Sequence, residues 1–265
     1  MKITIFTSNS LRHIHLINCI SAVSKNCHAI IEGKTLFPGK IKDFFKKSKI
    51  MKKYFNEVNR AENKFFQSSK FIKKNVKTKF IKQGDLNYLK KKDILEALGA
   101  DLYVIFGSSF IKGWLINYLM KKKAINIHMG LSPFYRGSSC NFWAIYDNKP
   151  EYVGATIHFL SKGLDSGKIL HHCLPDTKKS NIFEYTMSSV LSAHKCLQKM
   201  IKNKKISKIK PIKQNRLLQI RYTKNKDFND KLIKIFFKKR IKILKSKNEI
   251  ERNSNKLKLI NVFKV

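Results

Sequence analysis

Short runs of apolar residues divide most of the chain into strands and helices. Continuous or alternating apolar runs rich in β-branched residues are typical of strands. Such runs predict strands at residues 2–6, 28–31, 102–106, 124–128, 152–160 and 168–174. The run at 102–106 is apolar at every position, which is typical of a strand buried on both faces of a parallel sheet.

Apolar residues at helical spacing lie between these strands. They predict helices at about 11–23, 93–98, 110–120 and 183–201. Asn9 or Ser10 would cap the first helix, and Asn181 with Glu184 has the pattern of a capping box before the last. A lysine-rich segment at about 38–76 also carries aromatic residues, and we expect one or two helices there, laid over the domain.

The alternation of strands and helices indicates an α/β fold with an open, Rossmann-like, mostly parallel sheet flanked by helices. Ligands of such sheets bind at the carboxyl ends of the strands. We predict a catalytic domain over residues 1–204, with the lysine-rich segment at about 38–76 as a helical insertion. Residues 205–265 would form a short, basic, partly helical C-terminal extension, whose basic helix at about 230–244 packs on the domain.

Length and composition fit a globular protein with one sizeable core. The chain has 265 residues, of which 43% are hydrophobic. No apolar run approaches the roughly 20 residues that span a bilayer, and the amino-terminal run is too short for a signal peptide, so we expect a cytoplasmic protein. The 5 cysteines are scattered and include no Cys-x-x-Cys pair, which argues against a disulfide framework and a structural zinc site.

The net charge of +39 is the second unusual feature of the composition. A surface this basic binds polyanions in a salt-dependent way. Lysine supplies almost all of the charge and is spread along the chain, whereas recognition of base edges favours arginine. Asn, Ile and Lys are abundant together, as in a strongly AT-rich coding sequence. Compositional drift is therefore the preferred explanation, and association with nucleic acid is left open.

Candidate chemistry is concentrated near the end of the fourth predicted strand. Asn126 and His128 are two residues apart, so they point to the same face of an extended strand. Asp165 lies between two glycines, in a loop that can fold back over the strand end. An amide donor, an imidazole and a carboxylate are the groups needed to hold an oxyanion and to move a proton during acyl transfer. That chemistry requires no metal.

These residues resemble the formyltransferase family that uses 10-formyltetrahydrofolate. The family motif reads roughly Asn-x-His-Pro-Ser-Leu-Leu-Pro-x-Tyr/Phe-Arg-Gly and is followed by a Gly/Glu-x-Asp-x-Gly loop. It is matched here at Asn126, His128, Leu131, Pro133, Tyr135, Arg136, Gly137 and Asp165. The sequence departs from it at Met129-Gly130, which replaces Pro-Ser, and at Ser132, which replaces leucine. The resemblance is good over roughly residues 90–200 and loose before them.

The resemblance implies formyl transfer from 10-formyltetrahydrofolate, a co-substrate, to a small-molecule amine. Asn126 would donate to the oxyanion, and a protonated or polarised His128 would assist it. Asp165 would orient His128, raise its pKa and relay a proton through water. His158 would support the site.

Further site residues follow from the resemblance. Family members pair main-chain groups with the pteridine, which implies folate contacts at Gly107, Ser108, Ser109, Phe110, Ile111, Ser161, Gly163 and Leu164. The loop with Pro133, Tyr135, Arg136 and Gly137 would shape the acceptor side. The alternative, that Tyr135 packs and Arg136 pins the turn, stays open.

Several acceptors are compatible with this resemblance. Glycinamide ribonucleotide transformylases carry a glycine-rich phosphate loop after the first strand, and residues 6–13 contain no glycine. Methionyl-tRNA formyltransferases end in a β-barrel domain, for which the residues after 204 are too few and too helix-like. We therefore favour an amino-sugar nucleotide, and leave a homodimer open. The alternative of another class is a non-catalytic, basic, nucleic-acid-associated protein on the same scaffold.

Overall fold

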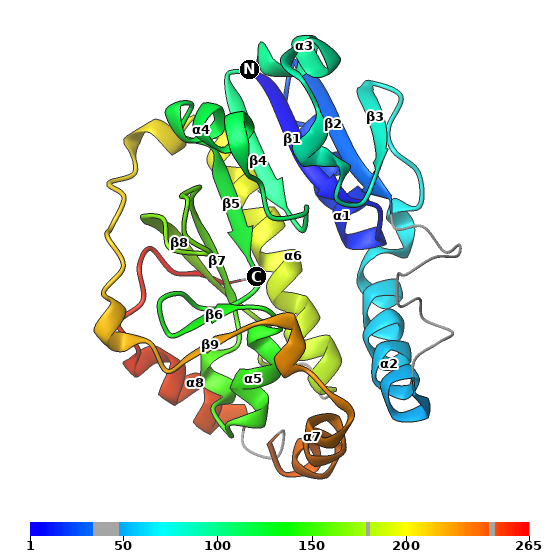
Figure 1. Cartoon of the computed structure of the whole chain (residues 1–265). Helices are drawn as coiled ribbons and strands as arrows, with labels where there is room; N and C mark the ends of the chain where they lie inside the picture. The colour runs from blue at the N-terminus through cyan, green and yellow to red at the C-terminus, as the bar shows by residue number, and fades with distance from the viewer. Residues whose placement is uncertain (34–47, 179–180, 244–246, 265) are drawn as a thin grey trace.

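A mostly parallel sheet organises the molecule (Figure 1). The computed structural model describes residues 1–33, 48–178, 181–243 and 247–264. The sheet has eight strands in the order β10-β8-β7-β5-β4-β1-β2-β3, and β6 and β9 form a second, two-stranded sheet. The strands are β1 (Lys2–Ser8), β2 (Asn26–Gly33), β3 (Val76–Lys82), β4 (Leu102–Phe106), β5 (Ile125–His128), β6 (Tyr135–Gly137), β7 (Ala155–Phe159), β8 (Ile169–Leu174), β9 (Arg221–Thr223) and β10 (Phe263–Lys264).

The strand directions confirm the predicted fold class. From β3 across β2, β1 and β4 to β5 the neighbours run parallel, whereas β7 runs antiparallel to both β5 and β8. All five residues of β4 are buried, as its continuous apolar run predicts. The strands predicted at 2–6, 28–31, 102–106, 124–128, 152–160 and 168–174 are present, with ends shifted by a few residues.

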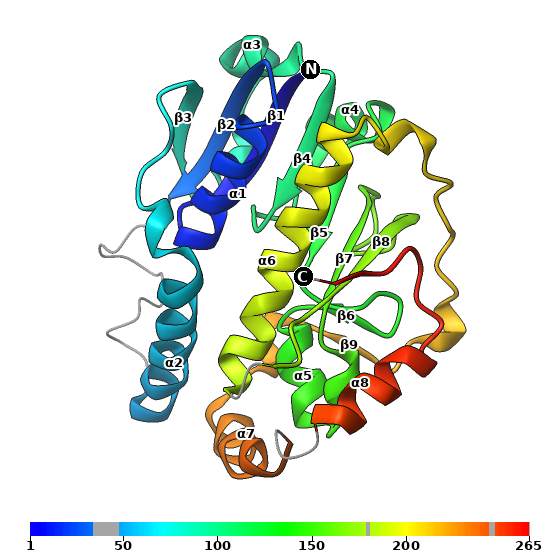
Figure 2. The same ribbon diagram turned by 180° about the vertical axis from the view of Figure 1, so that it is seen from behind.

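Helices cover both faces of the sheet (Figures 1 and 2). They are α1 (Leu11–Ser21), α2 (Lys49–Phe66), α3 (Leu95–Leu98), α4 (Gly113–Lys121), α5 (Cys140–Tyr146), α6 (Ile182–Lys202), α7 (Asp230–Ile243) and α8 (Lys247–Lys256). Short 3-10 turns are η2 (Gln67–Ser69), η3 (Asp85–Tyr88), η4 (Lys91–Ile94), η5 (Pro150–Tyr152), η6 (Ile206–Lys208), η7 (Arg216–Leu218) and η8 (Asn225–Asp227). Helices α1 and α6 pack together on one face, and α4 covers the other, with Leu115 and Leu119 in the same core cluster as Tyr103.

Helix α6 begins where the sequence predicts and Asn181 caps it, but the predicted capping box with Glu184 is absent. The Asn181 side chain accepts a hydrogen bond from the Phe183 amide, so Asn181 is the N-cap. Glu184 does not complete a capping box. Its carboxylate instead binds Lys64 Nζ at 2.9 Å, which ties α6 to α2. A tertiary ion pair has replaced the local bond that the sequence pattern suggests.

A strand that was not predicted follows the lysine-rich segment at about 38–76, where one or two helices were expected. Helix α2 occupies Lys49–Phe66, and residues 34–47 lie outside the described residues. Val76 then begins β3, which pairs in parallel with β2 at the edge of the sheet. Lysine alternates with other residues along much of this strand, and most of its side chains are exposed. Charged, exposed residues are typical of edge strands, and they hide the hydrophobic signal of a strand.

The residues after 204 contribute to both sheets. Strand β9 pairs with β6, and β10 pairs in parallel with the edge strand β8. Helix α7 contacts α2 and α5, and α8 contacts η5. The predicted helix at about 230–244 is therefore present as α7 and packed on the domain. A domain boundary near residue 204 remains a prediction.

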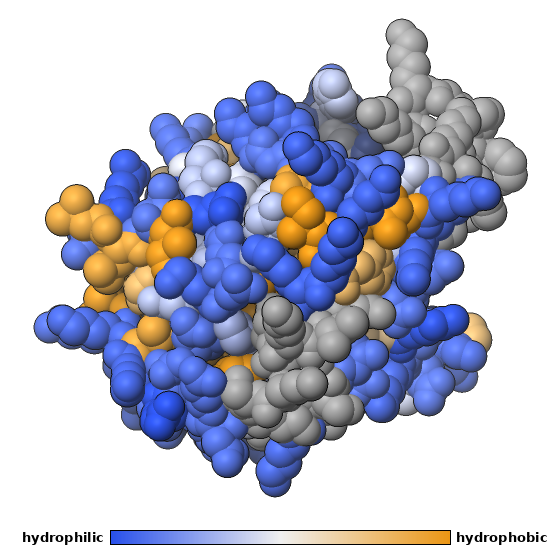
Figure 3. Space-filling model, turned by 90° about the horizontal axis from the view of Figure 1, so that it is seen from below, coloured by the Kyte–Doolittle hydropathy of each residue, from blue (hydrophilic) through white to orange (hydrophobic). Residues whose placement is uncertain are grey.

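Hydrophilic residues dominate the face of the molecule shown in Figure 3, with small apolar patches between them. In the described residues no helix is long and apolar enough to cross a membrane.

Candidate functional site

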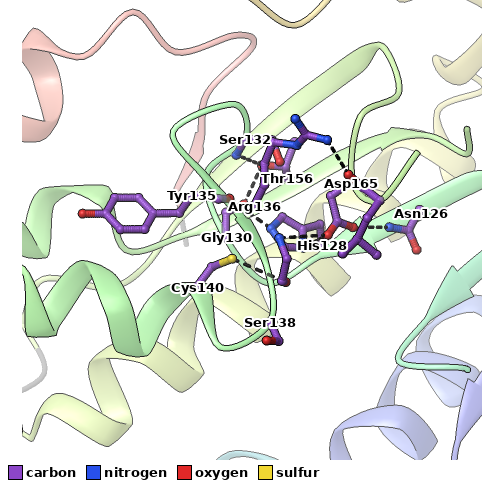
Figure 4. Close-up of polar contacts among 12 residues, drawn as sticks. Asn126, His128, Gly130, Ser132, Tyr135, Arg136, Ser138, Cys140, Thr156 and Asp165 are labelled. Carbon is purple, nitrogen blue, oxygen red and sulfur yellow. Dashed lines mark hydrogen bonds and ion pairs between the residues drawn. The ribbon is translucent and has the colours of Figure 1, made fainter. Parts of the chain in front are cut away.

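The candidate site lies where β5 ends, between β4 and β7. Asn126 and His128 occupy alternate positions of β5 and therefore share a face. Across the antiparallel pair, Asn126 lies opposite His158 of β7. The loop between β7 and β8 carries Asp165 back over this strand end (Figure 4). The structure thus brings together the three side chains predicted as catalytic, with His158 as a fourth member.

His158 fixes the orientation of the Asn126 amide. His158 Nδ1 lies 2.8 Å from its neighbour's carbonyl, Phe159 O, which can only accept, so in the neutral ring the proton sits on Nδ1. Nε2 then accepts from Asn126 Nδ2 at 3.0 Å. The second amide hydrogen points to Asp165 Oδ1 at 3.4 Å, a longer bond. This longer bond is the one that Asn126 can exchange for another acceptor most easily.

His128 is held between two oxygen acceptors. Its Nε2 lies 3.2 Å from Tyr135 O, and its Nδ1 lies 3.3 Å from Asp165 Oδ2 (Figure 4). A neutral ring can donate to one of these oxygens, and the charged ring can donate to both. The pair therefore offers a defined place for one additional proton, between His128 Nδ1 and Asp165 Oδ2.

The pKa values of His128 and Asp165 are both shifted downward. Burial lowers the pKa of His128, and the opposing effect of the Asp165 carboxylate is smaller. The rise that Asp165 was expected to cause in the His128 pKa is therefore present, but burial makes the net shift downward. Burial also acts to raise the pKa of Asp165, but His128 and His158 in their protonated forms, together with the Gly137 amide, outweigh it and bring the pKa to about 2. Asp165 is thus a carboxylate across the whole neutral range.

A cavity of about 400 Å³ opens beside these residues. Asn126, His128, His158 and Asp165 contribute to its wall. The sequence-predicted folate contacts also line it: Gly107, Ser108, Ser109, Phe110, Ile111, Ser161, Gly163 and Leu164. The apolar part of the wall includes Ile105, Ile116 and Leu160. One cavity therefore joins the polar cluster to both loops that the resemblance selected.

Residues 107–111 form a rigid edge of this cavity. Gly107 has φ +68, and a Cβ there would lie 2.3 Å from His13 Nε2, so the position needs glycine. The buried carboxylate of Glu32 accepts hydrogen bonds from the amides of Ser109 and Gly84. The end of β4 is thereby tied to the end of β2.

The loop after His128 has mostly structural contacts. Tyr135 is buried and its hydroxyl donates to Asp147 at 3.1 Å, while Arg136 donates to Leu164 O at 2.7 Å. Gly137 lines the cavity, whereas Pro133, Tyr135 and Arg136 are not among the lining residues. The contacts of Tyr135 and Arg136 fit the alternative in which one side chain packs and the other pins the turn.

Sequence reasoning missed several residues around the site. Thr156 of β7 accepts from the Ser132 amide at 2.9 Å and donates to Gly130 O at 2.6 Å, which holds the loop after His128. Ser138 and Asn225 line the cavity. Of these residues, only Thr156 could have been suspected from the sequence, because it lies on the same predicted strand as His158. Asn225 lies in the extension, where no sequence pattern pointed to the site.

No group of three or more His, Cys, Asp or Glu side chains that could hold a metal occurs in the part of the chain that the structure describes. Cys140 is buried and close to the site, with its Sγ 3.5 Å from Gly137 O. Burial raises the pKa of this thiol well above its ordinary value. Cys140 therefore fills a gap next to the loop, as its small size suggests.

The chain has an α/β fold with a buried polar cluster beside a cavity at the strand ends, and comparison with known proteins gives the family. The family model described as "Formyl transferase" matches residues 46–200. The match covers more than half of the chain, and the chain belongs to the formyl transferase family.

Curated relatives match over shorter segments. The methionyl-tRNA formyltransferase of Synechococcus sp. (strain JA-3-3Ab) is 37% identical over 76 residues, which are 29% of this chain and 23% of that protein. The mitochondrial formyltetrahydrofolate deformylase 2 of Arabidopsis thaliana is 31% identical over 121 residues, 43% of this chain and 35% of that protein. The matched segment thus spans about a quarter to a third of these relatives.

Solved structures share the fold over most of the chain. A sugar N-formyltransferase from Shewanella sp. FDAARGOS_354 has a TM-score of 0.53 at 15% identity and covers 89% of this chain and 86% of that one. A phosphoribosylglycinamide formyltransferase from Anaplasma phagocytophilum has a TM-score of 0.52 at 18% identity and covers 79% and 89%. At these identities the comparison shows a common fold.

Proposed function

We propose that this chain transfers a formyl group from 10-formyltetrahydrofolate to an acceptor amine. The observation that carries the proposal is the cluster of Asn126, His128 and Asp165 on the wall of the 400 Å³ cavity. An amide donor and an imidazole each lie within hydrogen-bond reach of one ionised carboxylate, beside a space large enough for a small molecule. The family match supports the same reaction.

The cavity residues fit a folate. Residues 107–111 and the loop from Ser161 to Asp165 present main-chain groups, and the ring system would pack against Ile105, Ile116 and Leu160. A relative of the same fold supports this: a Helicobacter canadensis N-formyltransferase, with a TM-score of 0.53 at 15% identity, is described in complex with folinic acid and dTDP-3-aminofucose. When bound, 10-formyltetrahydrofolate supplies a formyl carbon and a nitrogen that takes up a proton.

The chain's own residues would stabilise the developing negative charge and transfer one proton. Asn126 would release its 3.4 Å bond to Asp165 and donate to the oxygen that gains negative charge. His158 would keep the Asn126 amide in this orientation by accepting a hydrogen bond from its Nδ2. The proton lost by the acceptor amine would be held between His128 Nδ1 and Asp165 Oδ2, before it passes to the departing nitrogen.

The acceptor we propose is an amino-sugar nucleotide. The dTDP-3-aminofucose complex of the Helicobacter canadensis protein supports this class, and the turn after β1 lacks the glycines of a phosphate loop. Methionyl-tRNA is the second candidate, because methionyl-tRNA formyltransferases are among the relatives and the chain carries a net charge of +39. Water is the third, since the Arabidopsis thaliana relative is a deformylase.

The test uses the purified full chain with 10-formyltetrahydrofolate and follows release of tetrahydrofolate by absorbance. dTDP-amino sugars, glycinamide ribonucleotide and methionyl initiator tRNA are offered separately, and one reaction contains no acceptor. We expect turnover that depends on an amino-sugar nucleotide and produces its formamide. Turnover without acceptor would identify a hydrolase instead. Failure of the chain to bind the folate would overturn the proposal and favour a non-catalytic basic protein.

A further inference from the structure

A segment of the extension crosses the back of the Asp165 loop. We define residues 212–225 as the brace segment. At its start Ile212 exchanges two backbone hydrogen bonds with Ile169 of β8, at 2.8 and 2.9 Å. At its end β9 pairs with β6, and Asn225 reaches the wall of the cavity. The brace segment therefore links the far end of the Asp165 loop to the loop that follows His128.

Gln214 of the brace segment binds the main chain of the Asp165 loop directly. Its Nε2 donates to Asp165 O and to Gly167 O, both at 2.8 Å. Both hydrogens of the amide are thus used on carbonyls that can only accept. The flipped amide would place an oxygen against two oxygens, so the contacts fix the orientation of the side chain.

Gln214 holds Asp165 in an uncommon main-chain conformation. Asp165 has φ +47, in the left-handed region, where residues with a side chain are uncommon. The carbonyl of the preceding residue is held as well, since Arg136 donates to Leu164 O at 2.7 Å and to Gln219 Oε1 of the brace segment at 3.2 Å. The carbonyls of Leu164, Asp165 and Gly167 therefore all accept from side chains outside the loop.

We propose that Gln214 is a positioning residue, which holds the Asp165 main chain so that its carboxylate stays 3.3 Å from His128 Nδ1. The inference deepens the proposed function, because it gives the extension a part in the catalytic site. Gln214 is not among the residues that line the cavity, so it would act on the reaction through Asp165. A carboxylate displaced by about 1 Å typically reduces turnover about a hundred-fold.

The test compares Gln214→Leu with a matched control. Leucine is of similar size and removes both donated bonds, and Gln214 Oε1 accepts no hydrogen bond from the described residues that the change would lose. The control is Gln198→Leu on α6, where another half-buried glutamine donates to Cys19 O at 2.9 Å and is not among the residues that line the cavity. Both full-length variants are compared with the wild type for thermal unfolding, folate binding, kcat, KM, and the NMR titration of His128 without substrate.

For Gln214→Leu we expect kcat to fall about ten- to a hundred-fold, with folate Kd and KM changed less than about three-fold. The His128 titration should move to lower pH by about half a unit or more, because the ring loses part of its carboxylate partner. Gln198→Leu should leave kcat and the His128 titration unchanged. An unchanged His128 titration in Gln214→Leu would overturn the inference, whatever the loss of stability. If the wild type turned over no amine, the proposed function would fail, and the titration would still decide the role of Gln214.

Discussion

At the scale of single residues, Gly130, which replaces the serine of the family motif, has a structural explanation. A Cβ on Gly130 would lie 2.5 Å from the Cβ of Cys140 and 2.6 Å from His128 Nε2. The loop after His128 therefore passes so close to the His128 ring that glycine is the residue that fits. The Gly130 carbonyl accepts a hydrogen bond from Thr156, which limits how far the loop can move away from His128.

Gly130→Ala should consequently disturb His128 more than a usual small substitution. The added methyl must push back either Cys140 or the imidazole, and overpacking of this kind costs about 1–3 kcal/mol of stability. We expect a lower Tm and at least about a ten-fold loss of turnover, measured by thermal unfolding and by the folate assay. Gly99→Ala is the control, since a Cβ there meets only Glu96 O at 3.6 Å. A Gly130→Ala protein with wild-type turnover would show that the loop can move away from His128.

The side chains of the site could be predicted only in part. Asn126, His128 and Asp165 were found because a strand and a glycine-flanked loop give recognisable spacing. The net direction of the His128 pKa was not predicted, because it depends on burial that the sequence does not display. Gln214 carries no local signal either: it lies 49 residues from Asp165 in sequence and acts through main-chain atoms.

At the scale of elements, His172 of β8 connects the loop after His128 with the end of the chain. This buried ring donates from Nε2 to Ser132 O at 2.7 Å and accepts at Nδ1 from the Ile260 amide at 2.9 Å. Both nitrogens are satisfied in the neutral ring, and a proton on Nδ1 would break the bond to Ile260. Burial lowers the pKa of His172 to about 4.

The stability of the fold should therefore decrease in mild acid. The unfolded His172 takes up a proton below pH 6.5, whereas the folded ring does so near pH 4, so its contribution is complete above pH 6.5 and is lost as pH falls between these values. At pH 5 we expect a loss of roughly 1–2 kcal/mol from this group, measured by denaturant unfolding. His172→Gln retains a donor and an acceptor without titrating, and should show a flatter pH dependence. If the free energies of unfolding of the wild type and of His172→Gln fell in parallel with pH, the assignment of this acid destabilisation to His172 would be contradicted.

Most elements could be predicted because their hydrophobic pattern agrees with their place in the core. Strand β4 and helix α6 are examples: one is apolar throughout and the other has a clear buried stripe. Strand β3 was missed because its exposed lysines are set by its position at the sheet edge. The short strands β6, β9 and β10 depend on contacts between distant segments, which no local pattern encodes.

At the scale of the whole molecule, the extension belongs to the architecture of the site. The Arg221 guanidinium binds both oxygens of Asp147 at 2.6 and 2.9 Å, and the Tyr135 hydroxyl donates to the same carboxylate. The sequence predicted that the extension packs on the domain. It did not predict that the extension would contact the Asp165 loop.

The most direct test of the account is the Asp165→Asn variant, compared with the wild type in folate binding and in turnover with the preferred acceptor between pH 5 and 9. The pKa of Asp165 is about 2, so the wild-type carboxylate is ionised throughout this range and should add no acid limb of its own to the profile. We expect Asp165→Asn to bind the folate within about three-fold of the wild type and to lose at least about a hundred-fold in turnover at every pH. An Asp165→Asn protein that turns over at the wild-type rate would contradict the assignment of proton transfer to the Asn126, His128 and Asp165 cluster.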